Sequence, residues 1–124
     1  MDYNKINKQN LPKWIDTLKY ITSIPKENNI KYYLSASGLE YILGSKKYPY
    51  DIDIFMSREN VRRVYKLLSK YKVSKLHYWE EDSTKLLEFQ GKCDDIPFEI
   101  CEWEEEPKKL VKKKFKGFEV LIIG

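Results

Sequence analysis

The chain has 124 residues, of which 42% are hydrophobic and 34% charged, a size that fits one modest domain and excludes a multidomain protein. Its longest apolar runs, such as residues 120–123, are far shorter than the ~20 residues of a membrane-spanning helix. Its polar N-terminus is unlike a signal peptide, so we expect a cytoplasmic protein with no membrane contact. The net charge of +4 is compatible with a polyanionic ligand such as a nucleoside triphosphate or RNA. One histidine and two cysteines indicate neither a zinc site nor a disulfide framework.

The first part of the chain predicts a helix, a strand and a turn. Apolar side chains recur at helical spacing over residues 11–22, and we expect this helix to close before Pro25. Residues 30–34 favour a short strand. The strand runs into four small residues, 35–38, where the backbone can approach another group closely.

A short helix, a loop and a second strand are expected next. Residues 39–43 fit a helix that ends at Gly44, because glycine readily adopts the conformation that terminates helices. A polar loop carrying Lys46 and Lys47 then leads into a strand over residues 50–55.

The middle of the chain predicts one long helix and three strands. Ser57 is a good N-cap, and an apolar stripe with basic residues around it indicates a helix over 58–71. Segments 73–79, 84–90 and 96–101 are typical of strands separated by polar turns, which suggests an antiparallel meander.

The end of the chain predicts a helix and a last strand. Acidic residues 104–106 precede the lysine-rich segment 108–114, an order that the helix dipole favours, and residues 118–123 form an apolar strand. We therefore expect a single α+β domain over residues 1–124. Its sheet should be mixed and largely antiparallel, with helices packed mainly on one face.

Two acids stand out because they interrupt an apolar strand. Asp51 and Asp53 flank Ile52, and since strand side chains alternate, both carboxylates should leave one face while Ile52 and Ile54 enter the core. Two adjacent like charges repel unless a divalent cation binds between them, and carboxylate oxygens suit Mg²⁺ or Mn²⁺. The alternative reading is a solvated pair on an edge strand.

Glu99 repeats this pattern in a later segment. It lies between Phe98 and Ile100, so a strand beside the first one would bring a third carboxylate to the same cation. Two-metal phosphoryl transfer needs such a set, with a carboxylate able to serve as base. Glu102 competes for this position, although it alternates onto the opposite face from Glu99.

The small-residue turn and the following loop are candidates for phosphate binding. Ser35, Ala36 and Ser37 would present backbone N–H groups to a triphosphate without bulky side chains in the way. Lys46 and Lys47 precede the acid pair, where an ammonium can neutralise phosphate charge. The alternatives are an ordinary strand-to-helix turn and two solvated lysines.

Together these motifs resemble the signature of the DNA polymerase beta type nucleotidyltransferase superfamily. Residues 33–44 are similar to its small-residue turn and short helix ending in Leu-Gly, and residues 51–54, Asp-Ile-Asp-Ile, resemble its acidic strand. Residues 98–100 resemble the later strand with the third acid. The branch with this form of signature contains CCA-adding enzymes, lincosamide nucleotidyltransferases and related toxin-like proteins.

The resemblance implies a function and a set of site residues. Asp51, Asp53 and Glu99 would bind the metal ions and act in catalysis, transferring a nucleoside monophosphate from an NTP such as ATP to a hydroxyl acceptor with release of pyrophosphate. The paired small residues of the family turn, Gly-Gly or Gly-Ser, are Ser35 and Ala36 here, and the chain ends soon after its last strand. The second substrate, an RNA or a protein among others, is therefore expected to need a partner protein or a second copy of the chain.

Two other functions stay open at this point. The first is a nucleotidyltransferase-fold module that binds nucleotide or protein without turnover, because Ser35 and Ala36 lack the backbone freedom of glycine. The second is a basic RNA-binding domain that uses the helix and C-terminal lysines, with binding that is indifferent to the acid pair.

Overall fold

The structure, a computed structural model, describes residues 5–71 and 74–124. The helices in these residues are α1 (Leu11–Glu27), α2 (Ala36–Ile42), α3 (Arg58–Leu67) and the short 3₁₀ helix η1 (Ser69–Tyr71). The strands are β1 (Tyr33–Ser35), β2 (Ile52–Met56), β3 (His77–Glu81), β4 (Thr84–Cys93), β5 (Ile96–Glu102), β6 (Leu110–Phe115) and β7 (Phe118–Ile123). No helix in the described part is long and apolar enough to cross a membrane.

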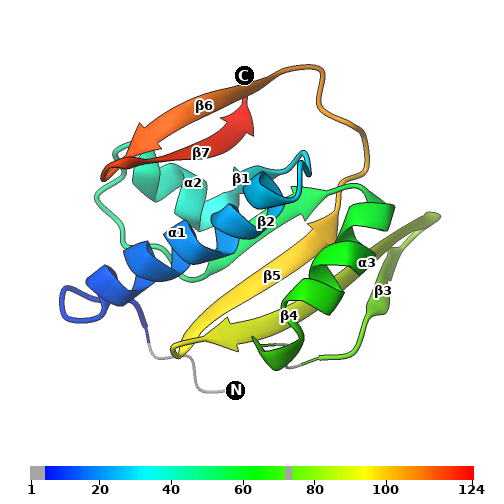
Figure 1. Cartoon of the computed structure of the whole chain (residues 1–124), viewed down its shortest axis with the longest axis horizontal. Helices are drawn as coiled ribbons and strands as arrows, with labels where there is room; N and C mark the ends of the chain where they lie inside the picture. The colour runs from blue at the N-terminus through cyan, green and yellow to red at the C-terminus, as the bar shows by residue number, and fades with distance from the viewer. Residues whose placement is uncertain (1–4, 72–73) are drawn as a thin grey trace.

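Five strands form the main sheet, in the order β1-β2-β5-β4-β3 (Figure 1). The β2–β5 pair at its centre is parallel, and every other neighbouring pair is antiparallel. The expected α+β class with a mixed, largely antiparallel sheet is confirmed. That residues 1–124 make a single domain stays a prediction.

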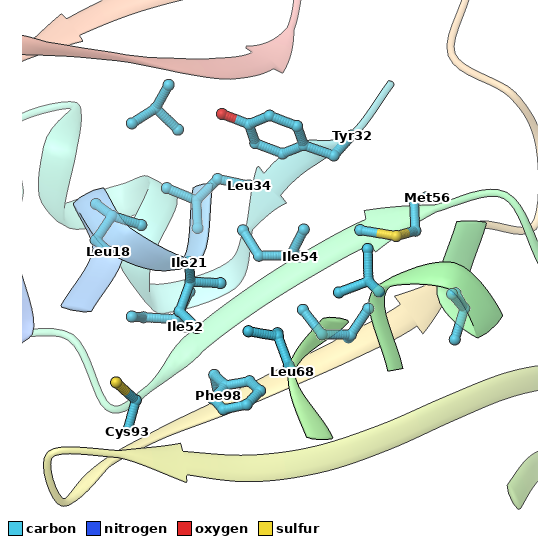
Figure 2. Close-up of a cluster of buried hydrophobic side chains, with 14 of the residues drawn as sticks. Leu18, Ile21, Tyr32, Leu34, Ile52, Ile54, Met56, Leu68, Cys93 and Phe98 are labelled. Carbon is cyan, nitrogen blue, oxygen red and sulfur yellow. The ribbon is translucent and has the colours of Figure 1, made fainter. Parts of the chain in front are cut away.

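The helices cover one face of this sheet because the strands alternate in polarity. Ile52, Ile54, Phe98 and Ile100 are buried on that face. They pack with side chains of α1 and α3 and with Leu68, which follows α3; Figure 2 shows Leu18 and Ile21 of α1 and Leu68 in this cluster. The in-between residues of the same strands point to the opposite face, which is the face left open for a site.

The first helix runs past Pro25, contrary to the expectation that it closes before this residue. It ends at Glu27 and contains the proline in its last turn. The ring is buried, and its carbonyl oxygen accepts a hydrogen bond from the N–H of Ile30 at 2.8 Å. Burial of the ring and this bond offset the N–H that proline lacks, so tertiary packing overrides the local stop signal.

The other predicted helices and strands differ mainly at their ends. The Ser57 hydroxyl accepts the N–H of Asn60 at 3.3 Å, which confirms the N-cap, and α3 passes into η1 instead of continuing to residue 71. The small-residue turn does not exist as a separate loop, because β1 passes directly into α2. The predicted strand over 73–79 is described only from residue 74, and β3 occupies His77–Glu81.

The helix expected over residues 108–114 is wrong, since this segment forms strand β6. It pairs antiparallel with β7 as a separate two-stranded sheet. Lys116 and Gly117 join the strands with φ angles of 47° and 88°, the positive values of a tight hairpin turn. Cross-strand pairing with the apolar residues 118–123 therefore outweighs the dipole pattern that favoured a helix.

Gly91 provides a test of this packing, because it lets η1 lie against β4. A Cβ at this position would overlap the carbonyl oxygen of Tyr71 and approach the ring of Phe98 to 2.5 Å. We expect Gly91→Ala to lower the free energy of unfolding by roughly 2–3 kcal/mol through overpacking, measured by chemical denaturation.

Gly44→Ala is the matched control for this substitution. Its φ is +109°, and an added Cβ meets no atom within 4 Å, so only backbone strain of about 1 kcal/mol is expected. If Gly91→Ala and Gly44→Ala lowered the free energy of unfolding by the same amount, the close approach of η1 to β4 would be contradicted.

Candidate functional site

Three carboxylates from two strands meet on the open face of the sheet. Asp53 lies directly opposite Glu99 in the parallel β2–β5 pair, and Asp51 immediately precedes β2. One oxygen from each of the three side chains lies within 4.8 Å of the others. The structure thus brings together the acids that the sequence predicted, and their roles stay predictions.

Burial of the opposite face sets this register. Ile52 pairs with Phe98, and Ile54 pairs with Ile100, all four in the core. A slip of one residue would exchange the two faces of a strand and place its acids among apolar side chains. The hydrophobic core therefore places Asp53 beside Glu99.

The closeness of the carboxylates makes full ionisation unfavourable. Burial, with the adjacent Asp51 and Glu99, raises the pKa of Asp53 to about 8. Burial also raises the pKa of Asp51, and the nearby Glu99 adds to this shift. Without a cation, a proton is thus retained in the cluster near neutral pH.

Glu99 is the member that stays ionised. Burial by itself would push its pKa up, but hydrogen bonds that involve Glu88, Gln90 and Cys101 outweigh burial and hold the pKa below its usual value. The Gln90 amide donates to Glu99 at 3.1 Å (Nε2 to Oε1) from the neighbouring strand β4.

A second row of polar groups on the same face was missed by the sequence reasoning. Glu88 on β4 accepts from the Cys101 thiol at 3.5 Å and contacts the ring nitrogen Nε2 of His77 at 3.0 Å. Burial and then the two glutamates raise the pKa of Cys101, so it is a thiol and not a nucleophilic thiolate. The available signal was Glu88 itself, which lies between buried Leu87 and Phe89 as Glu99 lies between Phe98 and Ile100.

Glu102, the competing third acid, has a different role. Its carboxylate accepts from Arg58 at 2.8 Å and from the N–H of Leu87 at 3.0 Å, so it joins α3 to the sheet. Its oxygens are outside the cluster of Asp51, Asp53 and Glu99. The structure therefore places Glu99, and not Glu102, beside the aspartates.

A cavity of about 630 Å³ opens over this part of the sheet. Its apolar lining residues are Tyr33 and Phe55 on β1 and β2, and Trp79 and Leu86 on β3 and β4. The ring of Tyr33 stacks on Phe55, with centroids 5.3 Å apart, and lies parallel to Trp103. The charged lining consists of the carboxylates Asp53, Glu88, Glu99, Glu102, Glu104 and Glu105, and no lysine or arginine of the described residues lines it.

The residues predicted to bind phosphate are only partly gathered at this cavity. Ser35 and Ala36 line it, and Ser35 lies opposite Asp53 in the β1–β2 pair. The Ser37 hydroxyl accepts the N–H of Tyr50 at 2.9 Å and so ties α2 to the loop before β2. Lys46 and Lys47 are exposed in that loop and do not line the cavity.

Comparison with known proteins identifies the fold. No protein-family model and no curated protein matches the sequence. The crystal structure of a "putative nucleotidyltransferase" from Thermotoga maritima matches with a TM-score of 0.76 and 17% sequence identity, over 99% of this chain and 83% of that chain. The chain has the fold of that "putative nucleotidyltransferase". At this identity the match establishes the fold alone, and membership of the superfamily and of one of its branches stays a prediction.

Ala36 allows a test of the strand-to-helix junction. It has a φ of 57°, a left-handed conformation that costs a residue with a Cβ roughly 1–2 kcal/mol relative to glycine. We expect Ala36→Gly to raise the free energy of unfolding by up to about 1 kcal/mol, because the glycine also loses more chain entropy on folding. A loss of stability in chemical denaturation would contradict the left-handed conformation.

The acid cluster predicts how stability varies with pH in metal-free protein. Because the pKa of folded Asp53 is about 8 and that of an unfolded aspartate is about 3.9, the folded state holds the extra proton between these values. Stability should therefore fall as pH rises from about 4 to 8. Asp53→Asn should flatten this slope and be more stable than the wild type at pH 8, measured by denaturant unfolding with a chelator.

Asp82→Asn is the control for this experiment. Asp82 is exposed in the turn between β3 and β4, so its substitution should leave the pH profile of the wild type unchanged. A wild-type stability that rises steadily from pH 5 to pH 8 would show that Asp53 is ionised in the folded protein.

Proposed function

We propose that this protein is a metal-dependent nucleotidyltransferase that transfers a nucleoside monophosphate from an NTP to a hydroxyl acceptor. The convergence of Asp51, Asp53 and Glu99, of which Asp53 and Glu99 line the cavity, carries this proposal. The shared fold with a "putative nucleotidyltransferase" supports it.

The donor set fits a divalent cation. Three carboxylates with oxygens within 4.8 Å of one another supply hard ligands, and their mutual repulsion favours a bound cation over a retained proton. Asp51, Asp53 and Glu99 would hold Mg²⁺ or Mn²⁺. When bound, such ions stabilise the charge that develops on the transferred phosphoryl group and on the attacking and leaving oxygens.

The charge of the cavity supports metal dependence. The charged residues that line it, among those described, are all acidic. A triphosphate that enters without cations is therefore repelled by these carboxylates. Glu99, held as a carboxylate by Gln90, is a fixed negative group that can position a cation. Tyr33 and Phe55 offer an apolar wall against which a nucleobase can stack.

A nucleotide-binding module without turnover is the second candidate. The observation that favours it is the strand-to-helix junction, where Ser35 and Ala36 replace the Gly-Gly or Gly-Ser of the family turn and Ala36 carries its methyl group in a left-handed conformation. This methyl group lies on the cavity lining, where the backbone would approach a triphosphate.

The enzyme and the module both bind a nucleotide, so an assay of metal-dependent nucleotide binding tests what the two proposed functions have in common. We expect wild-type protein to bind a fluorescent ATP analogue in the presence of Mn²⁺ and to lose this binding with a chelator. Asp53→Asn and Glu99→Gln should each weaken the Mn²⁺-dependent affinity at least tenfold, because each removes a charged ligand. Equilibrium fluorescence titration measures the effect.

Glu102→Gln is the matched control, because Glu102 lines the same cavity but lies outside the acid cluster. It should retain the metal dependence of the wild type. Nucleotide binding that does not depend on a metal, or an equal loss in Glu102→Gln, would overturn the assignment of the cluster.

Labelled ATP separates the enzyme from the module. Incubation with Mg²⁺, α-labelled ATP and a cell extract should give a labelled acceptor, with no such product from γ-labelled ATP. Asp53→Asn should abolish it. Saturable binding of the nucleotide without any labelled product favours the module.

A further inference from the structure

A second charged feature lies away from the acidic cavity, between α1 and the β6–β7 hairpin. Lys19 and Lys26 of α1 and Lys112 and Lys114 of β6 line two adjoining hollows of about 410 and 140 Å³. We call these two hollows and their four lysines the lysine groove. It shares no lining residue with the cavity that contains Asp53 and Glu99.

The secondary structure aligns these lysines into two rows. Lys19 and Lys26 are seven residues apart, so they lie on one face of α1 at a spacing of about 10 Å along its axis. Lys112 and Lys114 are two residues apart on β6, which places them on one face about 7 Å apart. The rows come from segments almost a hundred residues apart in sequence, and the fold brings them to one groove.

The groove has a fixed floor. Tyr32 is buried in it, and its hydroxyl accepts the N–H of Leu121 at 3.2 Å, which ties β7 to the segment before β1. Val120 of β7 is also fully buried beside it. The hairpin is therefore held against the body of the protein, and the two rows of lysines keep their relative positions.

The charge of the groove is unbalanced. Glu119 is its acidic lining residue, against four lysines, and in the described residues no ion pair joins any of these lysines to a carboxylate. All four lysines are exposed, so their ammonium groups are accessible. Four cations held in two rows repel one another, and a ligand that carries several regularly spaced anionic groups relieves this repulsion.

We propose that the lysine groove binds the phosphate backbone of a single-stranded nucleic acid. Lysines are flexible point charges that contact phosphates without demanding one geometry, and two rows suit a chain of phosphates better than one compact anion. The hollows measure about 140 and 410 Å³ and lie between a helix and a hairpin, a place that suits a single strand better than a duplex. The proposal does not depend on the chemistry proposed for the acidic cavity.

Salt dependence of binding tests this proposal. Fluorescence anisotropy with labelled U₁₂ is measured with a chelator and without nucleotide. Four phosphate contacts predict that the logarithm of the association constant falls with the logarithm of salt with a slope of about −2.8. The double variant with Lys112→Gln and Lys114→Gln keeps two of the four contacts. Its slope should be shallower, about −1.4, and its binding roughly 25-fold weaker at 0.1 M salt.

The matched control removes two lysines elsewhere. Lys66 on α3 and Lys75 before β3 are exposed and do not line the groove, so Lys66→Gln/Lys75→Gln should keep the wild-type slope despite the same change in net charge. Asp53→Asn should also keep it, which separates this proposal from the function of the acidic cavity. Unfolding curves check that each variant is folded.

Labelled dT₁₂ in a parallel titration distinguishes the source of the phosphates. The proposal is supported if U₁₂, dT₁₂ or both bind and if the double variant of Lys112 and Lys114 binds more weakly. The comparison of the two oligonucleotides then shows whether the groove prefers RNA or DNA. No binding of either at low salt, an equal loss in the control variant, or tighter binding of a duplex would overturn it.

Discussion

The parallel pairing of β2 with β5 is the interaction on which the rest of the structure depends. It aligns the buried faces of the two strands, Ile52 with Phe98 and Ile54 with Ile100, and by the same register sets Asp53 opposite Glu99. The hydrophobic effect thus supplies the free energy that brings the acidic side chains together. The cluster then relieves its repulsion by retaining a proton or by binding a cation.

The two faces of the protein have opposite electrostatic character although the net charge is small. The open face of the sheet carries the acidic cavity, and the groove between α1 and the hairpin carries the unpaired lysines. A net charge of +4, summed over 23 basic and 19 acidic residues, does not reveal this separation. Local fields, and not the total charge, decide which ligands each face can bind.

Much of the candidate site could be predicted from the sequence because acids within apolar strands are anomalous. Asp51, Asp53 and Glu99 each interrupt such a strand, and alternation then predicts the face from which they project. The same signal at Glu88 was not used. Proximity in sequence predicts that Lys46 and Lys47 lie near the phosphate site, but neither lysine lines the cavity.

Local patterns in the chain predict the α+β class, the start of a helix after Ser57 and the face of the acid pair, because caps and alternation depend on near neighbours in sequence. Contacts between distant segments bring Glu99 instead of Glu102 to the aspartates, make β6 a strand, and bring lysines of α1 and β6 to one groove. These features depend on pairing and packing between distant segments, whose free energy exceeds the local preferences that a sequence pattern reports.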